Sequence, residues 1–182
     1  MTWNLFIGMF HVNVSIWYFL IVLVIAGVIS VIVYKRYNKL YWKYIFAIWL
    51  IGYIFIIIYI TVLGRLDHPF DGIHYNLVPL WSLENIKLGY VETIYDKINN
   101  VILFIPLGVL TGGIISSISF SICRLLCSSM VVGSLVSIFI EILQLLTKNG
   151  WCEIDDVICN TIGCVIGCLF MKILYMLYRL RS

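Results

Sequence analysis

Five long apolar runs dominate the pattern of hydrophobic and polar positions along the 182-residue chain. They cover residues 12–33, 44–63, 98–118, 126–146 and 157–177. A helix that crosses a membrane needs about 20 mostly apolar residues, and each run reaches that length. The runs are uninterrupted, whereas the strands of a membrane β-barrel alternate in hydrophobicity over about ten residues. The pattern therefore predicts an all-α, polytopic, multi-pass protein of the cell membrane with about five transmembrane helices.

The longest connection, residues 64–97, has two different halves. The first, GRLDHPFDGIHYNLVP, is rich in turn residues. In the second, WSLENIKLGYVETIYDKI, apolar residues recur at helical spacing. These are Leu83, Ile86, Tyr90, Ile94 and Ile98. We expect an interfacial amphipathic helix here, leading into the third span.

The charged residues predict the orientation. Of the twelve basic residues, eight fall on one side of the predicted membrane, whereas all nine acidic residues fall on the other. Cytoplasmic loops carry an excess of Lys and Arg, so we expect the N-terminus outside and the C-terminus inside. Residues 1–13 contain neither Lys nor Arg, which favours a retained first span over a signal peptide. The net charge of +3 is small and spread along loops, which argues against nucleic-acid binding.

The six cysteines give no framework for disulfides or zinc. No CxxC pair or Cys/His cluster has the spacing of a zinc site, so we interpret the cysteines as small buried residues. Only Cys152 is expected on the outer side.

Polar residues are concentrated in the last three runs. Ser134, Ser137, Glu141 and Gln144 fall on one side of the fourth predicted helix. Another stripe, on the fifth helix, consists of Asp156, Asn160, Gly163 and Gly167. Its two glycines predict close contact between this helix and a neighbour. Because carboxylates inside a membrane are costly, Glu141 and Asp156 are the candidate catalytic residues of a site in the outer leaflet. In the alternative interpretation, these polar groups only hydrogen-bond helices together.

The stretch EIDDV, at the start of the fifth run, adds two more expectations. Asp155 is placed to cap the N-terminus of its own helix. Glu153 is expected on a loop, outside the site. Residues considered for ligand binding are Arg65, Asn76, Asn99, Asn100, Gln144, Asp155 and Asn160.

Four successive motifs resemble a known family. The segments YNLVPL, DKINNVILFIPLGVL, EILQ and EIDDVICNTIGCVIG are similar to the signatures of the VanZ-like family, membrane proteins named for a member of a glycopeptide-resistance cluster that lowers susceptibility to teicoplanin. The resemblance covers residues 65–167, and it suggests a scaffold of two spans, 1–63, followed by a VanZ-like region, 64–182. It implies that the signature positions are Asn76, Pro79, Asn100, Pro106, Gly108, Glu141, Gln144, Asp156, Asn160 and Gly163, with Arg65 matching an arginine ahead of the first motif. Related sequences often carry a basic residue just before EIDDV, and here Lys148 is displaced from that position.

Three function classes remain open. The resemblance implies a non-enzymatic membrane factor that keeps a lipoglycopeptide from cell-wall precursors by binding membrane lipid, a lipid-linked precursor or the drug's acyl chain. The second class is a membrane enzyme acting on a lipid or lipid-linked substrate. In it, Glu141 transfers a proton while Asp155 and Asp156 hold a divalent cation over a phosphate, with no other cofactor. The third is a small transporter, for which Pro106 is a cue although the spans show no inverted repeat. The oligomeric state is left open.

Overall fold

The computed structural model describes residues 39–63, 73–116, 121–148 and 150–181. Four long helices make up most of it: α2 (Lys39–Thr61), α4 (Val91–Ser116), α5 (Ile122–Thr147) and α6 (Ile154–Arg181). Each contains a stretch long and apolar enough to cross a membrane. The mostly helical fold is therefore confirmed, and four of the five predicted apolar runs form long helices that are candidate membrane spans. The predicted first span, residues 12–33, lies outside the described residues.

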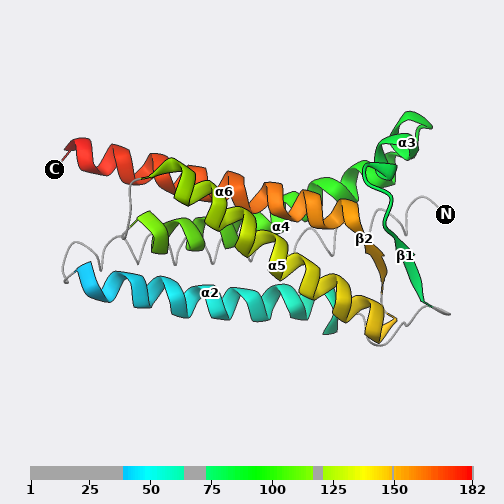
Figure 1. The fold of residues 1–182 in the computed structure, drawn as a ribbon, viewed down its shortest axis with the longest axis horizontal. Coiled ribbons are helices and arrows are strands. Elements are labelled where there is room, and N and C mark those ends of the chain that lie inside the picture. Colours follow the sequence, from blue (N-terminus) through cyan, green and yellow to red (C-terminus); the bar gives the residue numbers. More distant parts are fainter. Residues whose placement is uncertain (1–38, 64–72, 117–120, 149, 182) are drawn as a thin grey trace, which may run out of the picture. The chain divides into compact units, whose positions relative to one another are not determined.

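The part of the chain from Phe46 onward forms one compact unit, and its most extensive contact is between α4 and α6. These two helices run parallel to each other (Figure 1). Their backbones touch at glycines: a Cβ on Gly163 would overlap the carbonyl oxygen of Val101, and one on Gly167 would overlap that of Ile105. The glycine stripe in the sequence predicted this close approach, and the structure confirms it.

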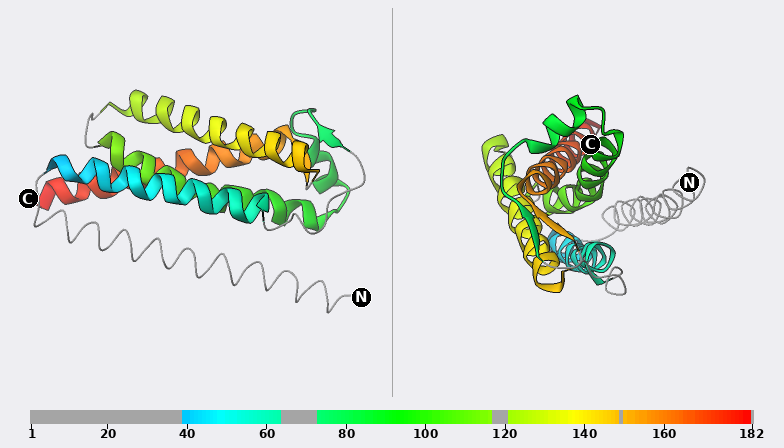
Figure 2. Two further views of the ribbon diagram at one scale, coloured as in Figure 1. Left: turned by 90° about the horizontal axis from the view of Figure 1, so that it is seen from below. Right: turned by 90° about the vertical axis from the view of Figure 1, so that its right-hand side faces the viewer.

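The other two long helices run antiparallel to this pair (Figure 2). On α2, the Tyr53 hydroxyl donates a hydrogen bond of 2.5 Å to the carbonyl oxygen of Leu103 on α4. On α5, Ser137 is hydrogen-bonded to Asn160 of α6. Large hydrophobic side chains on the outer faces of these helices remain exposed, as expected for surfaces that contact lipid.

A small sheet is the main feature that the all-α prediction lacked. Strand β1 (His74–Asn76) pairs in parallel with β2 (Trp151–Glu153), in the register His74↔Trp151. The His74 and Trp151 rings stack with their centroids 5.1 Å apart. This pairing fixes the segment ahead of α3 to the segment ahead of α6.

The predicted interfacial helix is interrupted. A short helix, α3 (Trp81–Lys87), ends before Gly89, whose φ of 90° lies in the left-handed region that favours glycine. The chain then turns, and α4 begins at Val91 rather than at residue 98. The second half of the predicted amphipathic segment is therefore the first part of the third span's helix. The location of α3 in the membrane interface remains a prediction.

Acidic residues gather at one end of the bundle, where α4 and α6 begin, α5 ends and the sheet lies (Figure 1). The acidic residues among those described are Glu84, Glu92, Asp96, Glu141, Glu153, Asp155 and Asp156. Arg124 lies at the opposite end, near the start of α5. This separation agrees with the predicted charge asymmetry. The side of the membrane that each end faces remains a prediction.

Candidate functional site

A polar cluster lies inside the acidic end of the bundle. We define it as Lys97 of α4, Glu141 of α5, Glu153 of β2, and Asp156 and Asn160 of α6. Five side chains from four elements thus meet where the helices start or finish. The sequence predicted Glu141, Asp156 and Asn160 as site residues, and the structure brings these three residues, from α5 and α6, to the same end of the bundle.

Lys97 is the centre of the cluster. Its Nζ lies 2.5 Å from Glu153 Oε2 and also donates to Asp156 Oδ1. The side chains of Lys97, Glu153 and Asp156 are only 12%, 13% and 21% exposed, so water screens these ion pairs weakly. The Trp81 ring covers the ammonium, with its centroid 5.7 Å from Nζ, in a cation–π contact. Lys97 therefore neutralises part of the acidic charge in a largely dry environment.

Glu153 does not lie on a free loop, as the sequence suggested. It belongs to β2, and its carboxylate is paired with Lys97. Burial raises the pKa of Glu153, and Lys97 opposes that increase by favouring the charged form. The expectation that Glu153 lies on a loop apart from the other carboxylates is therefore wrong, because Glu153 belongs to β2 and pairs with Lys97.

Glu141 joins α5 to the small sheet. Its side chain is 4% exposed, and Oε2 accepts a hydrogen bond of 2.9 Å from the backbone N–H of Glu153. This bond uses one oxygen of the carboxylate. The neighbouring Cys152 thiol has its pKa raised by burial and by the negative charge around it.

Asp155 has a different role from the one expected. The backbone N–H of Leu80 donates to its Oδ1 at 2.5 Å, and the backbone N–H of Ser82 donates to its Oδ2 at 2.9 Å. The Ser82 hydroxyl donates to the same Oδ2. Asp155 thus satisfies the N-terminal N–H groups of α3 rather than those of its own helix. With both oxygens engaged, this carboxylate holds α3 against the bundle.

Asn160 lies one turn below Asp156, in the contact between α5 and α6. Its Nδ2 donates a hydrogen bond of 2.8 Å to Ser137 Oγ, and Ser137 lies one turn before Glu141 on α5. The side chain is 4% exposed, yet Oδ1 has no hydrogen-bond partner among the described residues. Trp81 Nε1 is likewise buried without a partner in this part of the chain. Buried polar atoms are nearly always paired, so these two atoms call for an explanation.

The remaining predicted residues lie around the cluster. Gln144 Nε2 donates to the carbonyl oxygen of Thr61 at 3.2 Å, which ties α5 to α2. Asn76 ends β1, and its Oδ1 accepts a hydrogen bond from the N–H of Val78. Both residues support the fold next to the cluster. Two further candidates, Asn99 and Asn100, are half-buried on α4 just after Lys97, and Arg65 lies outside the described residues. Whether any of them contacts a ligand remains a prediction.

Divalent-cation binding by Asp155 and Asp156 finds little support in this geometry. Asp155 already accepts three hydrogen bonds, and Asp156 is paired with Lys97. Within the described ranges, no three side chains of His, Cys, Asp or Glu come together in a way that could hold a metal ion. The carboxylates are arranged around a lysine instead.

Three residues of this region were not predicted from the sequence: Lys97, Trp81 and Ser82. Lys97 was assigned to the connection ahead of the third span because apolar runs are counted from the last charged residue. Helical spacing could have indicated that Lys97 faces the fifth predicted helix. Lys97 is four residues before Val101, and Val101 faces Gly163 on α6, so Lys97 lies on the same face of α4.

Comparison with known proteins identifies the family. A scan against protein families matches the VanZ/LLP1 family over residues 46–175. The chain belongs to the VanZ/LLP1 family. The matched region contains the whole polar cluster and the α4–α6 contact, so the VanZ resemblance of the four motifs is confirmed. No curated protein and no solved structure matches the chain.

Proposed function

We propose that this VanZ-family protein lowers susceptibility to glycopeptide and lipoglycopeptide antibiotics such as teicoplanin, acting through the polar cluster. The observation that carries the proposal is the burial of Glu141, Glu153 and Asp156 around Lys97 at one end of an apolar bundle. Ionisable groups in such surroundings are costly to keep and commonly have a functional role.

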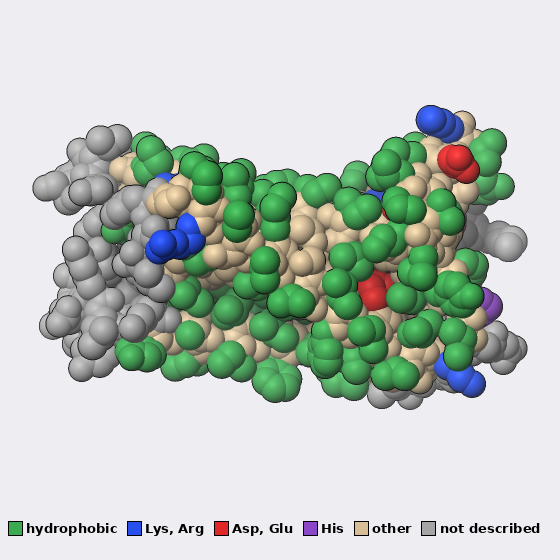
Figure 3. All heavy atoms as spheres, viewed as in Figure 1, with side chains coloured by type: hydrophobic (Ala, Val, Ile, Leu, Met, Phe, Trp, Pro, Cys, Tyr) green, Lys and Arg blue, Asp and Glu red, His purple; other side chains and the backbone are tan. Residues whose placement is uncertain are grey.

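The position of the cluster favours an amphipathic ligand. The end of the bundle that holds the cluster faces outward in the predicted topology, at the depth of the outer headgroups. Figure 3 shows acidic side chains surfacing among hydrophobic ones near this end. A membrane lipid or a lipid-linked cell-wall precursor combines a polar head with an apolar chain, and so fits both surfaces. By holding such a ligand, the protein would keep precursor and drug apart.

The geometry favours binding over cation-assisted catalysis. The hydrogen bonds of Asp155 hold α3, and those of Asp156 and Glu141 involve Lys97 and the backbone of β2. These contacts suit a polar site that recognises charge. We therefore rank a binding protein above an enzyme.

The test is teicoplanin susceptibility in a host where the unmodified protein has a measurable effect. Asp156→Asn should accumulate in the membrane at a normal level and lose the protective effect, because it removes a charge from the cluster and keeps the side-chain shape. Glu92→Gln, at an exposed site near the start of α4, is the matched control and should protect normally. Full protection by Asp156→Asn would contradict the proposal.

A further inference from the structure

We propose that the polar cluster binds a primary ammonium group of its ligand. Amine-bearing lipid headgroups and lysine side chains in the peptide of a lipid-linked precursor both carry such a group. This inference rests on the proposed function and specifies the chemistry that the site recognises.

The charge of the cluster is the first argument. Among the described residues, one cation lies close to Glu141, Glu153 and Asp156: it is Lys97, which pairs with Glu153 and Asp156. The carboxylate of Asp155, between Glu153 and Asp156 in the sequence, already accepts hydrogen bonds from backbone N–H groups at the start of α3. Negative charge in largely dry surroundings is stabilised by a positive partner. The cluster therefore prefers a cationic ligand.

The open acceptor atoms are the second argument, independent of charge. The hydrogen bond to β2 uses Glu141 Oε2, and Lys97 uses Asp156 Oδ1, which leaves Oε1 and Oδ2 for another donor. Asn160 Oδ1 is a third acceptor, in a side chain that is only 4% exposed, and it has no partner among the described residues. An ammonium group has three N–H donors and no acceptor, so its bonding capacity equals these three open positions.

The location of the acceptors is consistent with one binding position. Asn160 lies one turn from Asp156 along α6, and its partner Ser137 lies one turn from Glu141 along α5. Asp156 and Asn160 thus lie on one face of α6, and Ser137 and Glu141 lie on one face of α5. Lys97 shows that an ammonium fits between carboxylates here, because it already occupies the neighbouring position on the α4 side.

The second unpartnered atom, Trp81 Nε1, indicates what the ligand carries beside its ammonium group. Trp81 Nε1 is a buried donor, and its ring lies over Lys97 at the edge of the cluster. A donor requires an acceptor, such as a phosphate or carbonyl oxygen. A ligand that carries an ammonium close to such an oxygen would satisfy both ends of the site.

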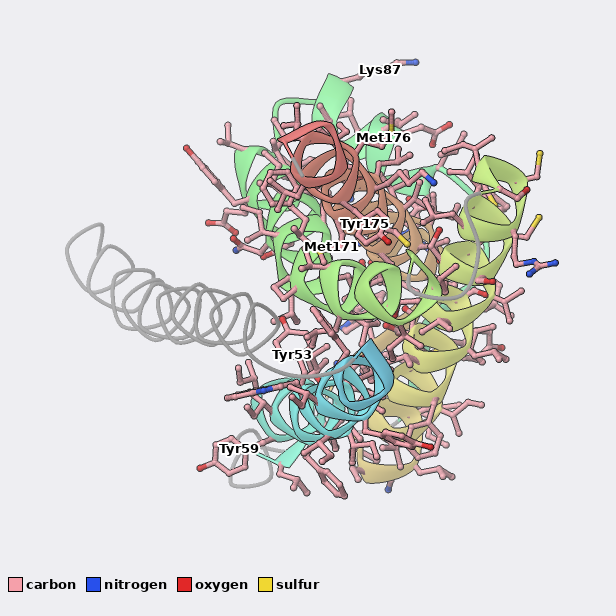
Figure 4. All side chains as sticks on the ribbon, turned by 90° about the vertical axis from the view of Figure 1, so that its left-hand side faces the viewer. Tyr53, Tyr59, Lys87, Met171, Tyr175 and Met176 are labelled. Carbon is pink, nitrogen blue, oxygen red and sulfur yellow. The ribbon has the colours of Figure 1, made fainter. Side chains whose placement is uncertain are left out.

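Access does not require the bundle to unfold. The side chains of Glu153 and Asp156 are 13% and 21% exposed, so a small polar group can reach the cluster from the surface. Lys87, by contrast, points away from the bundle at the end of α3 (Figure 4). It supplies no positive charge that would compete at the cluster.

The experiment compares lipids that differ only in the ammonium group. The purified, delipidated full chain is mixed with phosphatidylethanolamine or phosphatidylcholine of identical acyl chains, and bound lipid is counted by native mass spectrometry. The quaternary ammonium of phosphatidylcholine has no N–H. We expect phosphatidylethanolamine to be preferred by about tenfold, the equivalent of one charge-assisted hydrogen bond.

A second arm tests a peptide source for the amine. A soluble peptide with a free lysine side chain is compared with the same peptide acetylated at that lysine. Preference for phosphatidylethanolamine alone assigns the site to a lipid headgroup, and preference for the free lysine alone assigns it to the precursor peptide. No discrimination in either arm overturns the inference, and this comparison needs no variant to fold.

Variants then locate the preference. Glu141→Gln and Asn160→Leu should abolish it, whereas Glu92→Gln should leave it unchanged. Persistence in both cluster variants would place the amine elsewhere and overturn the assignment. Because binding is measured on purified protein and susceptibility in cells, an amine preference without any teicoplanin effect rejects only the proposed function. A teicoplanin effect without an amine preference rejects only this inference.

Discussion

Replacing Glu141 with Gln separates a structural carboxylate from a functional one. The side chain is 4% exposed and accepts one hydrogen bond of 2.9 Å, from the N–H of Glu153. Gln keeps the shape and an acceptor oxygen, so the bond to β2 survives as a neutral one. A hydrogen bond with a charged group contributes about 1.5–3 kcal/mol and a neutral one about 0.5–1.5 kcal/mol, so the change costs about 1 kcal/mol.

That loss is small against a typical free energy of unfolding of about 5–15 kcal/mol. We therefore expect Glu141→Gln to accumulate in the membrane at a normal level. Its protective effect against teicoplanin should nevertheless be lost, because Gln cannot ionise to pair with a cationic group. Glu141→Leu is a useful contrast. It leaves the buried N–H of Glu153 without an acceptor, and it should reduce abundance as well as protection.

The assay measures drug susceptibility and membrane abundance together for Glu141→Gln and for the unmodified protein. Normal abundance with lost protection supports a functional carboxylate. Full protection by Glu141→Gln, together with full protection by Asp156→Asn, would refute the reasoning. These carboxylates would then serve only to connect the helices to one another and to the small sheet.

Two further predictions concern packing and orientation. Gly163→Leu should lower the amount of folded protein and its melting temperature, because the new Cβ would overlap the carbonyl oxygen of Val101 and overpacking costs about 1–3 kcal/mol or more. The control is Gly52→Leu, where a Cβ meets open space. Equal melting temperatures of the two variants would contradict the α4–α6 contact. Cys152 should react with a membrane-impermeant thiol reagent on intact cells, slowly and best at alkaline pH because its pKa is raised, whereas the exposed Cys123 should react only after permeabilisation. Labelling of Cys123 but not of Cys152 would reverse the predicted orientation.

The sequence predicted the long helices well because one physical requirement determines them. A span must be apolar over about 20 residues, and such runs are visible without any tertiary information. The glycine stripe on α6 was equally readable, since only small residues let helix backbones touch. The cysteines were predicted less well. Cys164 and Cys168 are buried as expected, but Cys123 is exposed near the start of α5.

The features that sequence reasoning missed depend on contacts between distant segments. Each strand has only three residues, too few for a visible alternation of polar and apolar positions. The two strands are also far apart in the sequence, with α3, α4 and α5 between them. Local rules assigned Asp155 to its own helix, whereas its partner Ser82 is 73 residues away in the chain. Lys97 was left in a connection because a lone lysine looks incompatible with a span until its two carboxylate partners are known.

The close α4–α6 packing and the polar cluster are parts of one arrangement. Because Val101 and Gly163 are in backbone contact, the first halves of α4 and α6 are held side by side. Lys97, one turn before Val101 on α4, can therefore reach Asp156 on α6. A cluster that served only to join these helices would have no reason to leave the buried oxygen of Asn160 unpaired, since a hydrophobic side chain would pack there at lower cost. The unpaired amide lies beside the ion pairs, where a bound donor would complete it. This combination of rigid helix contact and incomplete polar pairing is expected of a preformed binding site rather than of a structural bridge.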